Sequence, residues 1–249
     1  MNIIVKLIIA IVILVILVTI WQWYFSGSSS TSIITGPIVA ENVPVKDLGA
    51  AASNIGNSLY SYSVWIYVKD WSYRIGEPKV LFSRKDGNGY VGPELVLGSS
   101  ENTITALVHS YQGNATPTSP GQTTLTQCQV TQVPIQTWVN IIVVLNQQAL
   151  DIYVDGKLTR TCVLPGVAAM GGTSQAPGLW VCPPLTNGGQ GGFDGYLANF
   201  RAFPYPLNPR QAYEIYREGH GGVEVSLFNK YRLKLAFLKG NREMGSLEI

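Results

Sequence analysis

The acidic side chains of this chain are not spaced as a catalytic pair on a strand. Retaining hydrolysis of a glycosidic bond needs two carboxylates about 5 to 5.5 Å apart, which on a strand means acidic residues two positions apart. Asp151 and Asp155 do not meet this spacing, and Asp155 lies in a predicted turn. Glu214 and Glu218 fall on a predicted helix, where we interpret them as solvated surface.

Other catalytic arrangements are missing from the sequence as well. The chain has 2 histidines, His109 and His220, and neither belongs to a recognisable Ser-His-Asp set. The glycine clusters at 171–172 and 188–192 lack the strand and helix context of a phosphate-binding loop. We therefore predict that the protein is not an enzyme and that it uses no cofactor.

The cysteines allow at most one disulfide. Cys128, Cys162 and Cys182 are too few for a disulfide scaffold, and no CxxC or Cys/His spacing indicates a zinc site. Cys128 precedes a predicted strand that begins near Trp138, and Cys162 ends the return strand of the following hairpin. A Cys128–Cys162 bridge in an oxidising compartment and a set of buried, reduced thiols both remain open.

Aromatic residues in predicted loops are candidates for ligand binding. The residues that we expect to contact a glycan or a partner are Trp71, Tyr73 and Tyr111, with Tyr90 and Trp180 as further candidates. Asp86 and Asn88 could supply oxygen ligands to calcium, but Asp-Gly and Asn-Gly also form turns on their own. The chain lacks the dense acidic run that would favour a calcium site.

The basic residues do not predict nucleic-acid binding. The formal net charge is +2, and no basic stripe is interleaved with aromatic residues. Lys230, Arg232 and Lys234 alternate with apolar residues and predict the outer face of a half-buried strand. This basic face could dock on an acidic protein surface or could keep an edge strand soluble. Asn114 begins a glycosylation sequon, which matters only if its loop is lumenal.

The first 25 residues predict a membrane anchor. From Ile3 to Ile20 the chain is apolar apart from Lys6 and Thr19, and about 20 such residues span a bilayer as a helix. Lys6 can snorkel to the interface, and the aromatic residues that follow the run suit the headgroup level. The residues that define the anchor are Ile3, Lys6, Ile20, Trp21 and Trp23. A cleaved signal peptide is the alternative, but its apolar region is usually shorter.

The remaining chain divides into a stalk and one domain. Residues 26–44 are rich in Ser, Thr and Gly and predict a flexible stalk. Residues 45–249 are long enough for a single all-β domain with a sizeable core. Beyond the apolar run no Lys or Arg occurs before Lys46, so the positive-inside rule places this domain outside the cell or in a lumen.

The periodicity of the domain predicts mainly β structure. Residues 60–68 alternate, with Tyr60, Tyr62, Val64, Ile66 and Val68 on one face. Residues 138–145 are nearly continuously apolar and predict a strand buried on both faces, with Trp65 and Trp138 in the core. Strands at 150–154 and 157–163 flank a hairpin turn at Asp155-Gly156. A helix is predicted from the N-cap Asn208 to Gly219, so we expect a two-sheet antiparallel sandwich with one short C-terminal helix.

Three blocks of the sequence resemble one known superfamily. They are residues 60–87 (YSYSVWIYVKDW…VLFSRKDG), 137–166 (TWVNIIVVLNQQALDIYVDGKLTRTCVLPG) and 192–219 (GFDGYLANFRAFPYPLNPRQAYEIYREG). In this order they resemble the concanavalin A-like lectin/glucanase superfamily in its laminin-G-like branch. The resemblance implies a jelly-roll sandwich of two antiparallel sheets.

The last residues of the chain resemble a narrower group of proteins within this superfamily. Residues 227–249 (LFNKYRLKLAFLKGNREMGSLEI) are similar to the tails of membrane-anchored lectin-like proteins of large DNA viruses with an internal membrane. This similarity implies a single-pass virion structural protein, a minor capsid component that links the inner membrane to the outer shell. Its expected partners are the lipid bilayer and capsid or other viral proteins. The alternative function is carbohydrate binding in attachment or glycan recognition.

Overall fold

The computed structural model describes residues 12–18, 30–41, 55–113, 122–170, 178–184, 191–221, 234–239 and 242–248. The chain separates into two units, Met1–Ser30 and Thr31–Ile249. In the first unit, residues 12–18 are helical. None of the helices in the described ranges combines the length and the apolar character needed to cross a bilayer. The predicted anchor residues Ile3, Lys6, Ile20, Trp21 and Trp23 lie outside those ranges.

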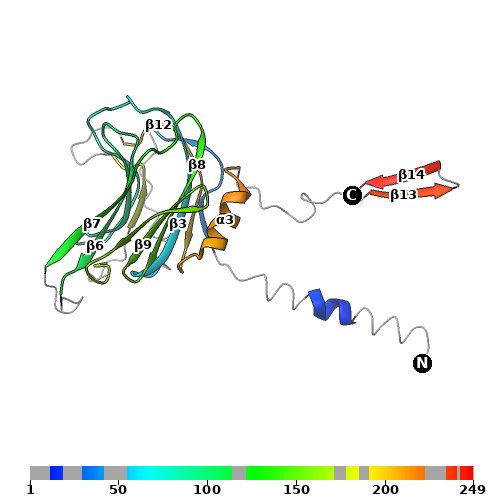
Figure 1. The fold of residues 1–249 in the computed structure, drawn as a ribbon, viewed down its shortest axis with the longest axis horizontal. Coiled ribbons are helices and arrows are strands. Elements are labelled where there is room, and N and C mark those ends of the chain that lie inside the picture. The colour runs from blue at the N-terminus through cyan, green and yellow to red at the C-terminus, as the bar shows by residue number, and fades with distance from the viewer. Residues whose placement is uncertain are drawn as a thin grey trace. The chain divides into compact units, whose positions relative to one another are not determined.

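The second unit contains a seven-stranded antiparallel sheet with the order β1-β12-β3-β8-β9-β10, in which β2 also pairs with β12 (Figure 1). The central strands β3 and β8 pair from Leu59↔Asn146 to Tyr67↔Trp138. The strands of this sheet are β1 (Thr31–Ile34), β2 (Ile38–Val39), β3 (Leu59–Asp70), β8 (Trp138–Asn146), β9 (Ala149–Val154), β10 (Lys157–Val163) and β12 (Asp194–Phe203).

A five-stranded antiparallel sheet packs against the first, with the order β11-β4-β5-β6-β7. Its strands are β4 (Lys79–Lys85), β5 (Val91–Leu97), β6 (Ile104–Tyr111), β7 (Thr123–Val130) and β11 (Gly178–Val181). Side chains of both sheets form one buried apolar cluster between them. The predicted two-sheet antiparallel sandwich is therefore confirmed.

The alternation predicted for the first long strand is also confirmed. The side chains of Tyr60, Tyr62, Val64, Ile66 and Val68 all face the core between the sheets and are at most 2 % exposed. The opposite face of β3 and β8 is covered in part by helix α3 (Pro209–Glu218). For this reason the run from residue 139 to residue 145 is buried on both faces, as its nearly continuous apolar character predicted.

Trp138 is a correction to the sequence prediction. Its side chain is half-buried and lies outside the apolar cluster between the sheets, whereas Trp65 is 5 % exposed as expected. Trp138 begins β8 at the sheet margin, and on its outer face its indole stacks on the imidazole of His220. An apolar residue at the end of a buried run need not share the burial of the run, because the covering helix does not reach it.

Local signals placed the hairpin and the helix correctly. Asp155 and Gly156 connect β9 to β10 with φ of 49° and 71°, the conformation that an Asp-Gly turn tolerates. The side chain of Asn208 caps α3 by accepting a hydrogen bond from the backbone N–H of Gln211. Ala212 and Ile215 then pack onto the outer face of the seven-stranded sheet.

Part of the predicted stalk is sheet instead. The strands β1 and β2 both pair with β12, within the segment 26–44 that was expected to be flexible. Ile33, Ile34 and Ile38 pack against the core. Burial of these branched side chains and pairing with an exposed sheet edge outweigh the low hydrophobicity of the Ser and Thr residues around them.

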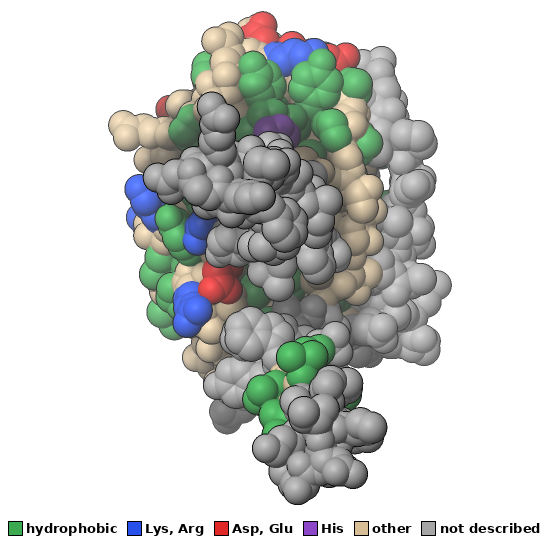
Figure 2. Space-filling model, turned by 90° about the vertical axis from the view of Figure 1, so that its right-hand side faces the viewer, with side chains coloured by type: hydrophobic (Ala, Val, Ile, Leu, Met, Phe, Trp, Pro, Cys, Tyr) green, Lys and Arg blue, Asp and Glu red, His purple; other side chains and the backbone are tan. Residues whose placement is uncertain are grey.

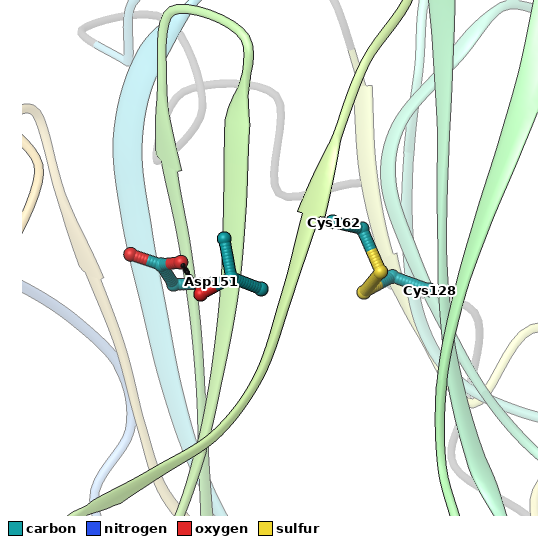
Figure 3. Close-up of a disulfide and its surroundings, with 4 residues drawn as sticks. Cys128, Asp151 and Cys162 are labelled. Carbon is teal, nitrogen blue, oxygen red and sulfur yellow. Dashed lines mark hydrogen bonds between the residues drawn. A yellow bond between two sulfur atoms is a disulfide. The ribbon is translucent and has the colours of Figure 1, made fainter.

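A disulfide joins the two sheets (Figure 3). Cys128 in β7 and Cys162 in β10 form the bond, which decides between the two alternatives left open by the sequence. Near it, the hydroxyl of Thr161 donates a hydrogen bond to the carboxylate of Asp151 at 2.5 Å. Cys182 is a free thiol, and burial raises its pKa to about 12.

Arg84 is a charged side chain buried in the core. Arg84 is 0 % exposed, and its guanidinium donates hydrogen bonds to the carbonyls of Ile55 at 2.8 Å, Gly56 at 3.0 Å and Gly92 at 3.2 Å. The guanidinium also lies over the ring of Tyr60, 5.5 Å from its centroid. Arg84 thereby fixes the chain entering β3 to the strand β5.

The C-terminal residues form a two-stranded hairpin of β13 (Lys234–Lys239) and β14 (Arg242–Glu248). The predicted basic strand is described only from Lys234 onward, and Lys230 and Arg232 lie outside the described residues. The sequon residue Asn114 lies outside them too.

Candidate ligand-binding groove

Two pockets adjoin at the loop between β5 and β6. The sheet pocket has a volume of about 400 Å³ and lies on the outer face of the five-stranded sheet. The loop pocket has a volume of about 520 Å³ and lies at the end of the sandwich. Ser100, Glu101 and Thr103 line both pockets, so the two form one continuous surface, which we call the groove.

Polar side chains of neighbouring strands form the floor of the sheet pocket. Thr105 in β6 pairs with Gln129 in β7, and Leu107 pairs with Gln127. Because side chains of a strand alternate between faces, Gln127 and Gln129 both point outward from β7 while Cys128 points into the core. The floor therefore offers amide and hydroxyl groups beside the aliphatic side chain of Leu107.

The loop pocket is more apolar. Trp71, Ile75 and Ile135 line it, and Ile75 and Ile135 are 65 % and 43 % exposed. The indole Nε1–H of Trp71 donates a hydrogen bond to the carbonyl of Gly98 at 3.1 Å, which fixes the ring against the β5–β6 loop. A pocket with an aromatic wall and a polar rim is typical of small-ligand sites.

Backbone hydrogen bonds hold the three loops of this end together. The N–H of Gly76 donates to the carbonyl of Ser99 at 2.9 Å. The N–H of Val133 donates to the carbonyl of Asn102 at 3.0 Å, and the Asn102 side chain donates back to the carbonyl of Val133 at 3.1 Å. The walls of the groove are thus fixed in position before a ligand arrives.

The groove is nearly free of charge. Among the residues that line the two pockets, Glu101 is the one with an ionisable side chain. Lys79 approaches the Trp71 ring to 5.9 Å from its centroid but is 1 % exposed. Burial lowers the pKa of Lys79, and the charge of Arg74 lowers it further.

A row of four register partners crosses the same sheet and ends in the groove. Ser83, Glu94, Leu107 and Gln127 occupy one line across four strands. The Glu94 carboxylate accepts a hydrogen bond from the Ser83 hydroxyl at 2.5 Å and pairs with Lys85 at 3.2 Å. The hydroxyl and the ammonium together hold the Glu94 carboxylate in place on this face.

His109 lies on this outer face, two residues beyond Leu107. Its Nδ1 accepts a hydrogen bond from the backbone N–H of Val91 at 3.0 Å, which leaves the proton of the neutral ring on Nε2. Burial lowers the pKa of His109, and the charge of Asp86 opposes this shift in part.

The aromatic residues predicted to bind a ligand lie in different elements and differ in their exposure. Trp71 lines the groove, and Tyr73 is half-buried in the loop that follows it. Tyr111 is a correction, because it is 5 % exposed and its ring is not available to a ligand. Tyr111 ends β6, and both Tyr111 and the preceding residue Ser110 are buried there. Trp180 is half-buried in β11, a strand rather than a loop, and pairs with Ser83.

The region considered for calcium is a turn. The Asp86 carboxylate accepts hydrogen bonds from the backbone N–H groups of Asn88 and Tyr90, each at 2.9 Å. Tyr90 packs on His109 with ring centroids 5.2 Å apart. In the part of the chain that the structure describes, no three His, Cys, Asp or Glu side chains are grouped to hold a metal ion.

Sequence reasoning missed most of the groove. Gln127, Gln129 and Thr105 are ordinary outward residues of alternating strands, and the chain separates them from Trp71 by more than thirty positions. The strand order brings them to one surface. The alternation of polar residues in 123–130 was the available signal, since it indicates that one face of β7 is solvated.

Comparison with known proteins identifies relatives of the fold. A family model described as the concanavalin A-like lectin/glucanases superfamily matches residues 46–212. No curated protein sequence matches the chain.

Solved structures with a similar fold include a crystal structure of an HCR/D F1240A mutant, with a TM-score of 0.52 and 11 % identity. They also include the binding domain of botulinum neurotoxin DC in complex with SialylT, with a TM-score of 0.51 and 11 % identity. Each match covers 78 % of this chain and 48 % of the other, so the chain spans about half the length of these proteins.

Proposed function

The chain belongs to the concanavalin A-like lectin/glucanase superfamily, and we propose that it is a non-enzymatic carbohydrate-binding protein whose ligand occupies the groove. The ligand class that suits the groove is a neutral oligosaccharide. The membrane anchor over residues 1–25 would display the domain on a bilayer; that anchor is part of the proposal.

The single observation that supports the proposal is that the groove combines an apolar wall with a wall of uncharged hydrogen-bonding groups. A sugar presents apolar C–H faces and many hydroxyl groups, so it needs both aromatic or aliphatic contacts and uncharged hydrogen-bonding groups. The loop pocket supplies the first through Trp71 and Ile135, and the sheet pocket supplies the second through Gln127 and Gln129.

The charge of the groove selects among sugars. Glu101 is the ionisable residue of its lining, and its carboxylate would repel an acidic sugar. A neutral sugar loses less hydration free energy on entering a surface without basic partners. We therefore expect neutral oligosaccharides to bind more tightly than sialylated or sulfated ones.

The solved binding domains support the fold and not the ligand, because their sequence identity to this chain is low. The role of a virion structural protein at the boundary of inner membrane and capsid stays a prediction from the similarity of residues 227–249. A protein partner on the particle is compatible with glycan binding in the groove.

The experiment that tests the proposal is an array of neutral and acidic oligosaccharides probed with the full chain in detergent micelles. We expect retention on neutral glycans and its loss when the matching soluble sugar is added. Retention that follows negative charge, or no retention on any glycan, would contradict the proposal.

A further inference from the structure

Three aromatic side chains form a row on the outer face of the seven-stranded sheet. Tyr67 in β3 pairs in register with Trp138 in β8 on one side and with Tyr196 in β12 on the other. The ring centroid of Tyr67 lies 5.7 Å from that of Trp138 and 6.2 Å from that of Tyr196. All three side chains are half-buried. We call this row the aromatic patch.

Figure 2 views the side of the molecule on which α3 lies and shows hydrophobic side chains gathered around a histidine, with basic and acidic side chains at the rim. Helix α3 covers another part of the same sheet face through Ala212 and Ile215. The groove lies on the outer face of the other sheet, so the aromatic patch is a separate surface.

Two nitrogen-bearing groups of the chain already lie on rings of the patch. The ammonium of Lys69 is 4.5 Å from the centroid of the Tyr196 ring. The imidazole of His220 stacks on Trp138 with centroids 4.5 Å apart and an angle of 8° between the planes. The faces of these rings therefore accept both a cation and a planar nitrogen group.

Acidic side chains outnumber basic ones around Lys69. The Asp194 carboxylate lies 3.7 Å from the Lys69 ammonium, and Asp70 is the register partner of Asp194 on β3. The pKa of Lys69 is raised by a hydrogen bond with Tyr196 and further by the charges of Asp194 and Glu41. The Asp70 carboxylate accepts hydrogen bonds from the N–H and the hydroxyl of Ser72. Asp194 and Glu41 are therefore two carboxylates acting on one ammonium, so the rim of the patch favours an additional positive charge.

We propose that the aromatic patch is a docking site for an arginine side chain of a protein partner, with the guanidinium on Tyr67 and Asp194 as its carboxylate. Among the described residues, no cation lies over the ring of Tyr67, although it is the central ring of the row. A guanidinium is planar and weakly hydrated, and it can stack on a ring while it pairs with a carboxylate.

The geometry favours arginine over a sugar. The planes of Trp138 and Tyr196 are inclined to that of Tyr67 by 60° and 52°, so the three rings do not make a flat platform for a pyranose. A guanidinium needs the face of one ring and one carboxylate, and both are present. The proposal does not depend on glycan binding in the groove.

The test is fluorescence anisotropy with a labelled peptide of alternating arginine and glycine, added to the full chain in detergent micelles. The control peptide has citrulline in place of arginine, which keeps the planar shape and removes the charge. We expect the arginine peptide to bind and the citrulline peptide to bind at least about fivefold more weakly, given the size of cation–π contacts.

Single substitutions test whether the arginine peptide binds at the aromatic patch. Tyr67→Leu should weaken arginine-peptide binding about fivefold or more, because the ring face is lost while every charge is kept. Tyr213→Leu is the matched control, since Tyr213 is 48 % exposed on α3 outside the patch. Lys69→Met removes the internal competitor for Tyr196 and Asp194 and should strengthen binding.

If Tyr67→Leu does not fold, as judged by thermal unfolding, the isosteric variant Asp194→Asn replaces it and should also weaken binding. Equal binding of the two peptides would overturn the proposal. Unchanged binding to Tyr67→Leu or Asp194→Asn, or displacement of the peptide by a neutral oligosaccharide, would overturn it as well.

Discussion

Cys128 and Cys162 connect the two sheets through their outermost strands. Cys128 lies in β7 at one edge of the five-stranded sheet, and Cys162 lies in β10 at one edge of the seven-stranded sheet. Their Cα atoms are 5.9 Å apart, and 34 positions separate them in the sequence. The bond closes one side of the sandwich, and Cys128 lies between Gln127 and Gln129 of the groove on the same strand.

The disulfide should contribute substantially to stability. A crosslink that closes a loop of 34 residues removes chain entropy from the unfolded state worth about 3–4 kcal/mol. We expect Cys162→Ala with Cys128→Ala to lower the free energy of unfolding by that amount in urea denaturation. Cys182→Ala is the control for loss of a thiol. Identical denaturation midpoints for the bridged protein and the double variant would contradict the prediction.

Arg84 should be required for the folded core. Its replacement by Met leaves the carbonyls of Ile55, Gly56 and Gly92 without their donor. An unsatisfied buried acceptor costs about 1–3 kcal/mol, so Arg84→Met should destabilise the domain by about 3 kcal/mol or more. Thermal unfolding measures the effect, with Arg217→Met on the exposed surface of α3 as the control. A change as small as that of the control would show that water satisfies these carbonyls.

Gly156 should be sensitive to a side chain for two reasons. Its φ is +71°, and an added Cβ would lie 3.0 Å from Cβ of Tyr216 and 3.1 Å from Cα of Tyr213. Gly76→Ala is a matched control, because its φ is +88° but nothing lies within 4 Å of the added atom. Both should lose about 1 kcal/mol from backbone strain, and Gly156→Ala should lose more. Equal losses would mean that α3 moves aside freely.

His109 should make the domain less stable in acid. Burial lowers its pKa below the value of about 6.5 that an unfolded chain shows. Between the two pKa values the unfolded state binds more protons than the folded state. The stability that the neutral, buried His109 contributes is therefore fully present above about pH 6.5 and is lost as the pH falls through the folded-state pKa. In unfolding curves at several pH values, His109→Gln should lose less stability than the parent between pH 7.5 and 5. Parallel curves would contradict this.

Local sequence patterns predicted the strands, the turn and the helix cap correctly, whereas the pairing of strands that are far apart in the sequence was not predicted. The alternation at 60–68, the turn at Asp155-Gly156 and the N-cap at Asn208 each depend on neighbours in the chain, and all three are confirmed. Strand pairing decides the rest. The Ser/Thr-rich segment 26–44 contains strands because β12 has an open edge that they extend.

The candidate site was less accessible to sequence reasoning. Exposure of an aromatic residue depends on what covers it, so Tyr111 is buried where exposure was expected and Trp138 is half-buried where burial was expected. Trp71 was correctly placed in a loop, and it lines the groove. Its polar partners come from strands whose neighbours are set by the topology of the whole sheet.

Calorimetric titration of the full chain with the best neutral oligosaccharide from the array tests the central claim most directly. Gln127→Ala with Gln129→Ala should weaken binding about tenfold, because each lost hydrogen bond to an uncharged ligand contributes about 0.5–1.5 kcal/mol. Gln148→Ala, an exposed glutamine in the β8–β9 turn, should bind like the parent. Equal affinity of all three proteins would contradict the assignment of the ligand to the groove.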